Sequence, residues 1–492
     1  MNRPIRTLSV GCLILFVALM LNLTYVQFFK ASWYNARADN RRVTEAAYSQ
    51  QRGDILVGKK AIATSKPSDD KYEWQRTYPG GKKYAPITGF MSYSYGQTGI
   101  ERSQDSVLSG QDNKLFTNRL VDLVTNSEPA GGNVELTIDP KVQDAAYQGL
   151  TALGDDVQAA AVAIDPKTGR ILAMASTPTY NPDKLATHDF GAAKKSYDQL
   201  AGDDDEPLLN RSIQTALPPG STFKLVTAAA AMENLGKDPD SKVYGGALLD
   251  LPQSDKDLPN ESGGSCGGDQ ITLTRALEVS CNTAFGSLGI DLTKEQLDDQ
   301  ARKFGFGQKY LTDLPNQATS TLADELDDLD SPPFRAYSAI GQYNVKATPL
   351  QMAMVSAGIA NGGTVMKPYI VDRVTSSSLD VIDQGNPTEI DDQPAVSNET
   401  AEGLTQMMVS TVENGTAAPA AIDGVTVAGK TGTAQSSKER APYAWFTSFA
   451  PAENPSIAVA VMVQKSGTER SEIAGGRLGG PIAKAMMEAA IS

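Results

Sequence analysis

A serine and a lysine three positions apart have the clearest capacity for chemistry in this sequence. Ser221 and Lys224 lie in the segment PPGSTFK, residues 218–224. On a helix, positions i and i+3 share one face, so the Lys224 amine can reach the Ser221 hydroxyl. Burial lowers the pKa of an amine, and the neutral amine can then accept the proton of the attacking serine. The spacing therefore predicts a serine nucleophile with a lysine base.

Histidine is a poor candidate for that base. The sequence holds one histidine, His188, in a loop rich in Asp and Pro that contains no neighbouring nucleophile. A triad of serine, histidine and acid would require this residue. We therefore expect His188 to lie outside the catalytic site, and a lysine held uncharged replaces it.

Two further motifs supply groups that a serine and lysine pair would use. Ser280 and Asn282 follow a predicted helix over residues 272–279. The Ser280 hydroxyl can relay protons, and the Asn282 amide can hold a substrate carbonyl or the lysine. The segment Lys430–Thr433, KTGT, lies on a predicted strand, where Gly432 allows a substrate to approach the backbone closely.

Each motif also has an ordinary structural explanation. The first also fits a capping serine with a lysine that reaches solvent, and the second fits a polar helix connection. The segment 68–71 repeats the Ser-x-x-Lys pattern, residues 167–169 repeat Lys-Thr-Gly, and residues 465–467 read Lys-Ser-Gly. We assign these copies to turns or strand ends. The ordered set of three motifs, each on a suitable element, is what makes the pattern specific.

The elements around these motifs predict an α+β domain. Residues 216–236 are apolar on nearly all faces, which indicates a buried helix with Ser221 as its cap and Gly236 at its end. Alternating or continuous apolar runs predict the remaining elements. These are a strand (134–139), a helix (140–153), a hairpin (159–176, with its turn at 165–169), three strands (425–435, 443–451 and 457–467) and a helix (481–491). They suggest an antiparallel sheet of about five strands flanked by helices.

The N-terminus predicts a membrane anchor. Leu8–Phe29 is an uncharged run of about 22 residues, long enough to cross ~30 Å of hydrocarbon. Arg3 and Arg6 precede it, so the tail should be cytoplasmic and the rest outside. The run is longer than a cleavable signal, and no clear Ala-x-Ala site follows. We expect a tail (1–7), an anchor (8–29), an irregular α+β pedestal (30–150) resembling a dimerisation module, and a catalytic domain (151–492).

The net charge and the cysteines limit which ligands and which covalent links we expect. A net charge of −14 without clustered lysine and arginine excludes nucleic-acid binding. We expect the acidic runs 203–206 and 324–330 to be solvated loops, and we expect neither metal nor cofactor. Cys12 lies in the predicted anchor. Cys266 and Cys281, in the exported part, fit either a disulfide or two unpaired buried thiols.

The three motifs in this order resemble those of penicillin-binding proteins and class A β-lactamases. Over nearly its whole length the chain is similar to class B penicillin-binding proteins. In length and in the sequence of its motifs it resembles the penicillin-binding protein A group of actinobacteria. The further segments that carry this resemblance are RGDI (52–55), GIE (99–101), LTID (136–139), NR (210–211), GQ (341–342), TPLQ (348–351) and NGG (361–363).

The resemblance implies a peptidoglycan D,D-transpeptidase. Ser221 would attack the D-Ala-D-Ala carbonyl of a stem peptide, Lys224 would take its proton, and Ser280 would assist the return of the proton. Lys430, Thr431 and Thr433 would hold the terminal carboxylate. β-Lactams would acylate Ser221, and proteins that polymerise glycan or belong to the divisome or elongasome would be partners. The alternatives are a D,D-carboxypeptidase, a β-lactamase-type hydrolase and a catalytically inert cell-wall scaffold.

Overall fold

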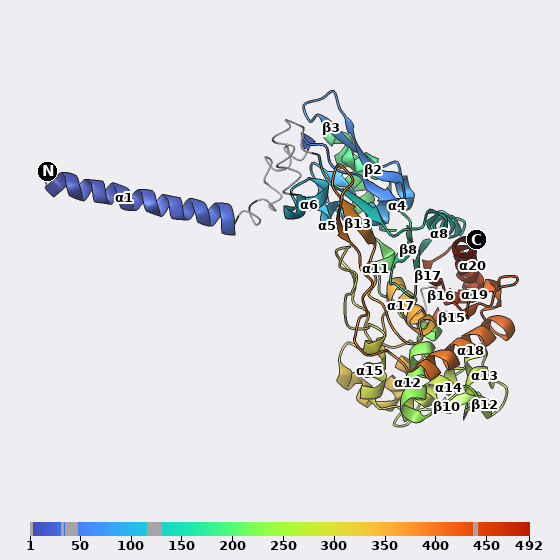
Figure 1. The fold of residues 1–492 in the computed structure, drawn as a ribbon. Helices are drawn as coiled ribbons and strands as arrows, with labels where there is room; N and C mark the ends of the chain where they lie inside the picture. The colour runs from blue at the N-terminus through green and yellow to red at the C-terminus, as the bar shows by residue number, and fades with distance from the viewer. Residues whose placement is uncertain (1–2, 31–33, 35–47, 116–129, 436–440) are drawn as a thin grey trace.

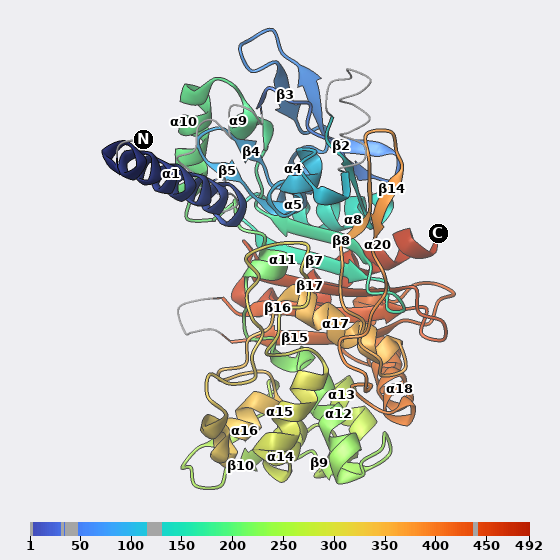
Figure 2. The ribbon, with the colours of Figure 1, turned by 60° about the vertical axis from the view of Figure 1, so that its left-hand side comes forward.

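The chain folds into a long N-terminal helix and a separate body built around two sheets. The computed structural model describes residues 3–30, 34, 48–115, 130–435 and 441–492. Figure 1 shows the N-terminal helix projecting away from the body. In Figure 2 the pedestal sheet is at the top, the central sheet lies in the middle, and a block of helices lies below it.

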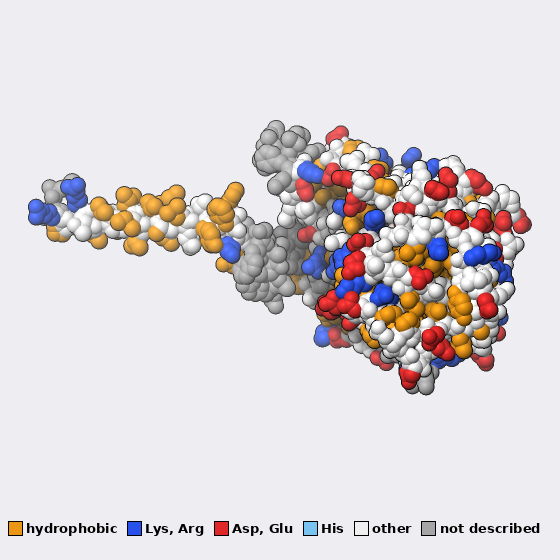
Figure 3. All heavy atoms as spheres, turned by 90° about the horizontal axis from the view of Figure 1, so that it is seen from below, with side chains coloured by type: hydrophobic (Ala, Val, Ile, Leu, Met, Phe, Trp, Pro, Cys, Tyr) orange, Lys and Arg blue, Asp and Glu red, His pale blue; other side chains and the backbone are white. Residues whose placement is uncertain are grey.

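The apolar N-terminal run forms one continuous helical segment, as predicted. α1 spans Arg3–Thr24 and continues as a π-helical turn, η1, over Tyr25–Phe29. None of its described side chains is buried against the body. Figure 3 shows hydrophobic side chains along this helix and cationic side chains at its outer end. The helix is therefore long and apolar enough to cross a membrane, and two arginines lie at its start.

The pedestal sheet has six strands in the order β14-β13-β6-β1-β2-β3. The pair β1 and β6 is parallel and the other pairs are antiparallel. The strands are β1 Ile55–Val57, β2 Lys60–Pro67, β3 Trp74–Thr77, β6 Asn133–Leu136, β13 Val371–Thr375 and β14 Val381–Gln384. The smaller elements around it are α4 Gly81–Thr88, β4 Met91–Ser92, β5 Gly96–Gln97, α5 Gly99–Ser103, α6 Asp105–Leu108 and η2 Asn113–Leu115. Two of its strands thus come from a hairpin more than 200 residues further along the chain, which the sequence did not indicate.

The central sheet has five antiparallel strands, as predicted, in the order β15-β16-β17-β7-β8. They are β7 Gln158–Ile164, β8 Ile171–Thr177, β15 Ala428–Ala434, β16 Tyr443–Ala450 and β17 Ile457–Lys465. Nearly every residue of these strands is buried, because helices cover both faces. β15 lies at one edge, so one side of the strand that carries Lys430–Thr433 is not paired within the sheet.

Helices pack on both faces of the central sheet. α8 (Pro140–Thr151) and α20 (Gly480–Ile491) cover one face through side chains such as Val142 and Met486. α17 (Pro349–Ala360) covers the other face, and α18 (Asn398–Asn414) packs on β15. The predicted helices over 140–153 and 481–491 are confirmed, although α8 ends two residues early. Short helices complete this region: α11 Arg211–Gln214, η5 Ala418–Ala420, η6 Arg470–Glu472 and α19 Gly475–Leu478. Two others, α9 Asp183–Ala186 and α10 Phe190–Ala201, lie beside β3 and β4 of the pedestal.

The helical block lies against the β15 edge of the central sheet. Its buried helix is α12 (Lys224–Leu235), which ends at Gly236 in the left-handed conformation, as predicted. The other helices are α13 Leu273–Glu278, α14 Asn282–Asp291, α15 Lys294–Lys303, η4 Leu326–Asp330 and α16 Pro332–Ala339. Two small antiparallel two-stranded sheets border them, β9 Lys242–Tyr244 with β12 Gln270–Thr272 and β10 Leu248–Asp250 with β11 Asp257–Pro259.

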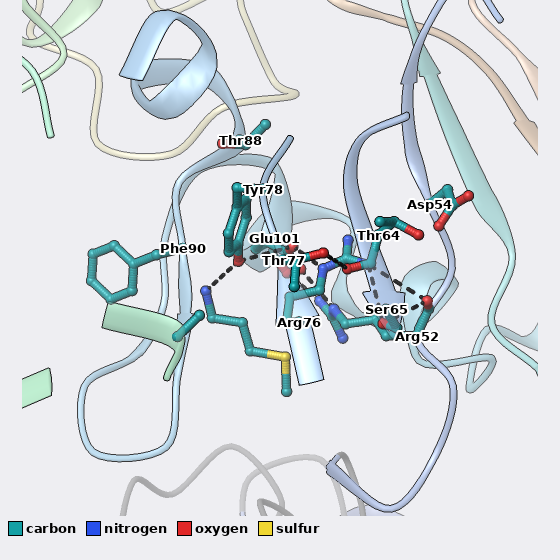
Figure 4. Close-up of polar contacts among 12 residues, drawn as sticks. Arg52, Asp54, Thr64, Ser65, Arg76, Thr77, Tyr78, Thr88, Phe90 and Glu101 are labelled. Atoms are coloured by element: carbon teal, nitrogen blue, oxygen red, sulfur yellow. Dashed lines mark hydrogen bonds and ion pairs between the residues drawn. The ribbon is translucent and has the colours of Figure 1, made fainter. Parts of the chain in front are cut away.

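A buried carboxylate holds the pedestal together. Glu101 on α5 accepts hydrogen bonds from Arg52 and Arg76, each at 2.6 Å, and from the Tyr78 hydroxyl at 3.2 Å. Figure 4 shows these side chains converging from different elements. Burial acts to raise the pKa of Glu101, but the charges of Arg76 and Arg52 outweigh it and hold the pKa below its ordinary value. A buried charge is tolerated because two cations compensate it.

Removal of this carboxylate should destabilise the pedestal strongly. Glu101→Ala leaves the buried Arg76 guanidinium without a carboxylate and leaves Arg52 with Asp105 alone, and we expect a loss of about 3–5 kcal/mol in the free energy of unfolding. Because the pKa of Glu101 is lowered, its contribution is present above the unfolded pKa and is lost as pH falls through the folded pKa. Urea unfolding of the detergent-solubilised chain at several pH values measures both effects.

The matched control is Glu135→Gln in the same sheet, because Glu135 forms a more exposed pair with Arg373. We expect it to cost at most about 1 kcal/mol. Equal losses for the two variants would contradict the role given to Glu101.

Candidate active site

Ser221 lies in a tight turn immediately before the buried helix of the helical block. Residues 220–222 form a 3-10 turn, η3, and α12 begins at Lys224 with Phe223 in the N-cap position. The prediction that Ser221 caps the helix is therefore wrong. The tighter turn places Ser221 one step outside the α-helix, and its hydroxyl makes no hydrogen bond with any residue that the structure describes. The hydroxyl is left available for another partner.

Glycine allows the strand β15 to approach this turn. Gly220 has a φ of +54°, and a Cβ atom there would lie 2.7 Å from the carbonyl oxygen of Thr433. A Cβ atom at Gly432 would lie 2.8 Å from the carbonyl oxygen of Pro219. Such contacts are shorter than atoms tolerate, so both positions need glycine. Ser221 and the Lys430–Thr433 strand are therefore neighbours.

The Lys224 side chain is fully buried in the helical block. Its Nζ donates to the Ser280 carbonyl at 2.7 Å and to Asn282 Oδ1 at 2.8 Å, and lies 3.3 Å from Ser280 Oγ. The predicted contact with the Ser221 hydroxyl is not among the hydrogen bonds of the described residues. Burial, and then the charge of Lys430, hold the pKa of Lys224 well below its ordinary value. The amine is thus set up to be neutral.

Ser280 joins the two lysines of the site. It has a φ of +57°, an unusual conformation for a non-glycine residue, which turns its backbone carbonyl toward Lys224. Its Oγ also accepts a hydrogen bond from Lys430 Nζ at 3.0 Å. The neighbouring Cys281 forms a disulfide with Cys266, which ties this turn to the loop before β12. Of the two alternatives left open by the sequence, the structure has the disulfide.

Asn282 and the strand β15 complete the cluster. Asn282 starts α14, and its amide oxygen holds Lys224 while its Nδ2 donates to the Pro259 carbonyl. Lys430 is fully buried, and burial lowers its pKa to about 7. Thr431 is hydrogen-bonded to Thr416 through their hydroxyl groups at 2.7 Å. The structure thus brings together Ser221 and all seven other predicted site residues, through the contacts above and the close approach of η3 to β15.

Sequence reasoning missed two residues near this cluster. Thr416 orients Thr431 from the loop after α18, and the carboxylate of Glu261 acts to raise the pKa of both lysines. Neither lies in a motif, and the contacts span segments far apart in the chain. No signal in a single sequence would have found them.

The other copies of the motifs lie in turns or at a strand end, as predicted. Residues 68–71 form part of the β2–β3 turn, residues 167–169 the β7–β8 turn, and Lys465 ends β17 and pairs with Asp205. His188 bonds Asp70 at 2.5 Å within a cluster of tyrosine rings. None of these residues contacts Ser221. The histidine takes no part in the cluster.

Comparison with known proteins assigns the family. The model of the penicillin binding protein transpeptidase domain matches residues 159–488, two thirds of the chain. The chain belongs to the class B penicillin-binding proteins. The model of the penicillin binding protein A dimerisation domain also matches, over residues 52–134.

Relatives in this family cover the whole chain. The peptidoglycan D,D-transpeptidase PbpA of Mycolicibacterium smegmatis is 40% identical over 100% of this chain and 99% of its own length. The protein of the same name from Mycobacterium tuberculosis is 38% identical with the same coverage. The solved penicillin G acyl-enzyme complex of penicillin-binding protein A from M. tuberculosis has a TM-score of 0.84 and 37% identity, covering 90% of this chain and 100% of that one.

The coupling between the two lysines should appear in the pH dependence of acylation. Lys430→Met removes a positive charge near Lys224, so the pKa of Lys224 should rise and a higher pH should be needed to obtain its neutral form. We expect the acidic limb of the rate of acylation by benzylpenicillin to move to higher pH. Stopped-flow measurement of the acylation rate between about pH 5 and 9 tests this, because a lysine with a lowered pKa changes its charge in this range.

Lys167→Met is a matched control, because it changes the same tripeptide in the β7–β8 turn and should leave the profile in place. An unshifted profile in Lys430→Met would mean that the two amines are not coupled.

Proposed function

We propose that this chain is a membrane-anchored serine D,D-transpeptidase that cross-links the stem peptides of peptidoglycan. The observation that carries the proposal is the buried Lys224 amine with its lowered pKa, one helical turn after Ser221 and beside the strand of Lys430. A neutral amine in this place is a base without a histidine. Membership of the class B penicillin-binding proteins and the PbpA relatives support the choice of peptidoglycan as substrate.

The donor stem peptide would bind along the unpaired edge of β15. An extended peptide can add to a sheet edge through backbone hydrogen bonds. Its terminal carboxylate would be held by Thr431, Thr433 and the amine of Lys430, whose pKa burial lowers to about 7. This arrangement fits a substrate that ends in D-Ala-D-Ala, with the anion at the inner end of the site.

The first half-reaction would form an ester on Ser221. Ser221 Oγ attacks the carbonyl carbon of the penultimate D-Ala, and its proton passes to Lys224 Nζ. The backbone N–H groups of Ser221 and Thr433 would stabilise the oxyanion. The C–N bond then breaks, and the leaving amine of the terminal D-Ala receives a proton from Lys224 through the Ser280 hydroxyl. A β-lactam would form the same ester when its ring C–N bond opens.

The second half-reaction would form the cross-link. The neutral amine of a second stem peptide attacks the ester carbonyl, and the new C–N bond replaces the bond to Ser221 Oγ. The amine loses one proton and Oγ regains one, so Ser221 and a neutral Lys224 are restored. Water in place of the amine would give hydrolysis instead, the D,D-carboxypeptidase reaction.

We also infer the placement of the chain at the cell surface. Residues 1–7 would lie in the cytoplasm and 8–29 in the membrane, with the pedestal and the transpeptidase domain outside it. The predicted boundary between these two domains, at residue 150, would move to the start of α8, because α8 (Pro140–Thr151) packs on the central sheet. The length of the apolar helix and the arginines at its start support this orientation. The β13–β14 hairpin would then be a part of the transpeptidase segment that completes the pedestal sheet. Proteins that polymerise glycan in the same membrane would be the partners.

Covalent labelling by fluorescent penicillin tests the nucleophile and its base. We expect Ser221→Ala to abolish labelling, and Lys224→Met to slow it by about 10²–10⁴-fold because the general base is lost. Ser68→Ala changes the other Ser-x-x-Lys segment and should label like the wild type. Persistent labelling of Ser221→Ala would remove Ser221 from its role, and an unlabelled wild type would favour an inert scaffold.

Mass spectrometry of products distinguishes the acyl acceptors. With a pentapeptide ending in D-Ala-D-Ala and a D-amino acid as acceptor, a transpeptidase exchanges the terminal residue. Release of the shortened peptide alone would identify a carboxypeptidase, and rapid turnover of penicillin without a stable adduct a β-lactamase.

A further inference from the structure

Two aromatic rings are stacked on the surface close to the nucleophile. Phe334 on α16 and Tyr343, in the turn after that helix, have ring centroids 4.4 Å apart and planes 13° from parallel. Phe334 is 40% exposed to solvent and Tyr343 is 38% exposed. Both rings therefore present apolar surface to solvent instead of filling a core. We call this pair the aromatic platform.

The backbone that carries the platform is strained. Tyr343 has a φ of +60°, a region that bulky residues rarely adopt and that glycine adopts freely. The ring of Tyr343 is stacked on Phe334 in spite of this conformation. Strained positions of this kind cluster at ligand-binding and active sites.

The turn that carries Tyr343 packs against the nucleophile turn. The Gly220 N–H donates to the Gly341 carbonyl at 2.9 Å, and Leu217 and Ala347 exchange two backbone hydrogen bonds. A Cβ atom at Gly341 would lie 2.1 Å from the Gly220 oxygen. Tyr343 is two residues beyond Gly341, within about 8 Å of it along the backbone. The backbone that carries the platform is therefore packed against the turn of Ser221.

The electrostatic surroundings of Tyr343 include two carboxylates, Asp328 and Asp324. Partial burial and the charges of Asp328 and Asp324 raise the pKa of Tyr343, so its phenol stays neutral. Asp324 pairs with Lys346 at 3.2 Å, whereas Asp328 pairs with no lysine or arginine in the described part of the chain. Aromatic faces beside carboxylates attract cations. The platform is therefore suited to an aliphatic chain that ends in an ammonium group.

We propose that Phe334 and Tyr343 form a subsite for the amine-bearing acceptor stem peptide, an inference that rests on the proposed transpeptidase function. The two substrates differ in charge where they approach Ser221. The donor ends in a carboxylate, which the acidic surroundings of the platform repel and the buried Lys430 attracts. The acceptor brings an amine that is protonated in water. The platform binds this cationic chain next to the turn of Ser221, and the amine gives its proton to water before its nitrogen attacks the acyl-enzyme.

Acceptor kinetics of the full-length, detergent-solubilised chain test the subsite. The donor is a pentapeptide ending in D-Ala-D-Ala, and the acceptors are D-lysine and D-norleucine, whose side chains share four carbons and differ in the terminal ammonium. We expect a lower KM for D-lysine. Tyr343→Gly should raise the KM for D-lysine roughly two- to fivefold, the size of an exposed cation–π contact. Asp328→Asn should raise the KM for D-lysine and leave that for D-norleucine unchanged.

Tyr343→Gly is a safe substitution for folding, because glycine suits a φ of +60°. Tyr343→Phe keeps the ring and should retain the KM of the wild type. Tyr197→Ala removes one ring of another stacked pair, Tyr95 with Tyr197, and should change neither KM nor the rate of penicillin acylation.

Three results would overturn the subsite. These are equal KM values for the two acceptors in the wild type, transfer to neither acceptor, or an equal slowing of acylation and acceptor transfer in Tyr343→Gly, which would place the platform on the donor side. The proposed function fails separately, if penicillin does not label Ser221 in the wild type.

Discussion

The desolvation of one amine is the constraint on which the active site depends. Lys224 has no access to water, and a second cation, Lys430, lies on the other side of Ser280. Charge on the amine is disfavoured by burial and by this neighbour. A neutral amine has two hydrogens, and the short contacts to the Ser280 carbonyl and Asn282 use both. In the proposed mechanism its lone pair would then accept a proton, from Ser221 directly or through Ser280 Oγ.

Such an amine is useful only if the nucleophile is held close to the strand that binds the substrate, and backbone packing provides this. Gly432 allows the backbone of β15 to contact the turn of Ser221. Gly341 allows the turn after α16 to contact the same turn. Backbone held against backbone has no side-chain rotamers to lose, so the position of the nucleophile is set by contacts that allow little adjustment. The Cys266–Cys281 disulfide restrains the Ser280 turn in the same way.

The sequence predicted the central sheet, its flanking helices and the membership of the site, because these follow from local signals: apolar runs, glycine and proline positions, and motifs of three or four residues. It did not predict that Ser221 lies outside the helix, since a 3-10 turn and a capped α-helix share the same residues. The β13–β14 hairpin was also missed, because short exposed strands carry little periodicity and their pairing with β6 is long-range. Glu261 and Thr416 act across such long-range contacts, which no spacing reveals.

Charge is separated between the two ends of the proposed substrate path, and this would give the two substrates different routes to Ser221. The inner end of the site holds Lys430, buried and partly protonated near neutral pH, which favours an anion. The outer end holds neutral rings and the carboxylates of Asp324 and Asp328. Because buried charges interact more strongly than exposed ones, the inner cation would decide which peptide acylates Ser221, while the solvent-screened outer charges would bias which amine approaches next. A donor that ends in a carboxylate would be repelled by the outer carboxylates and attracted by Lys430. It would therefore bind only at the inner end, where Lys430 and the β15 edge both contact it.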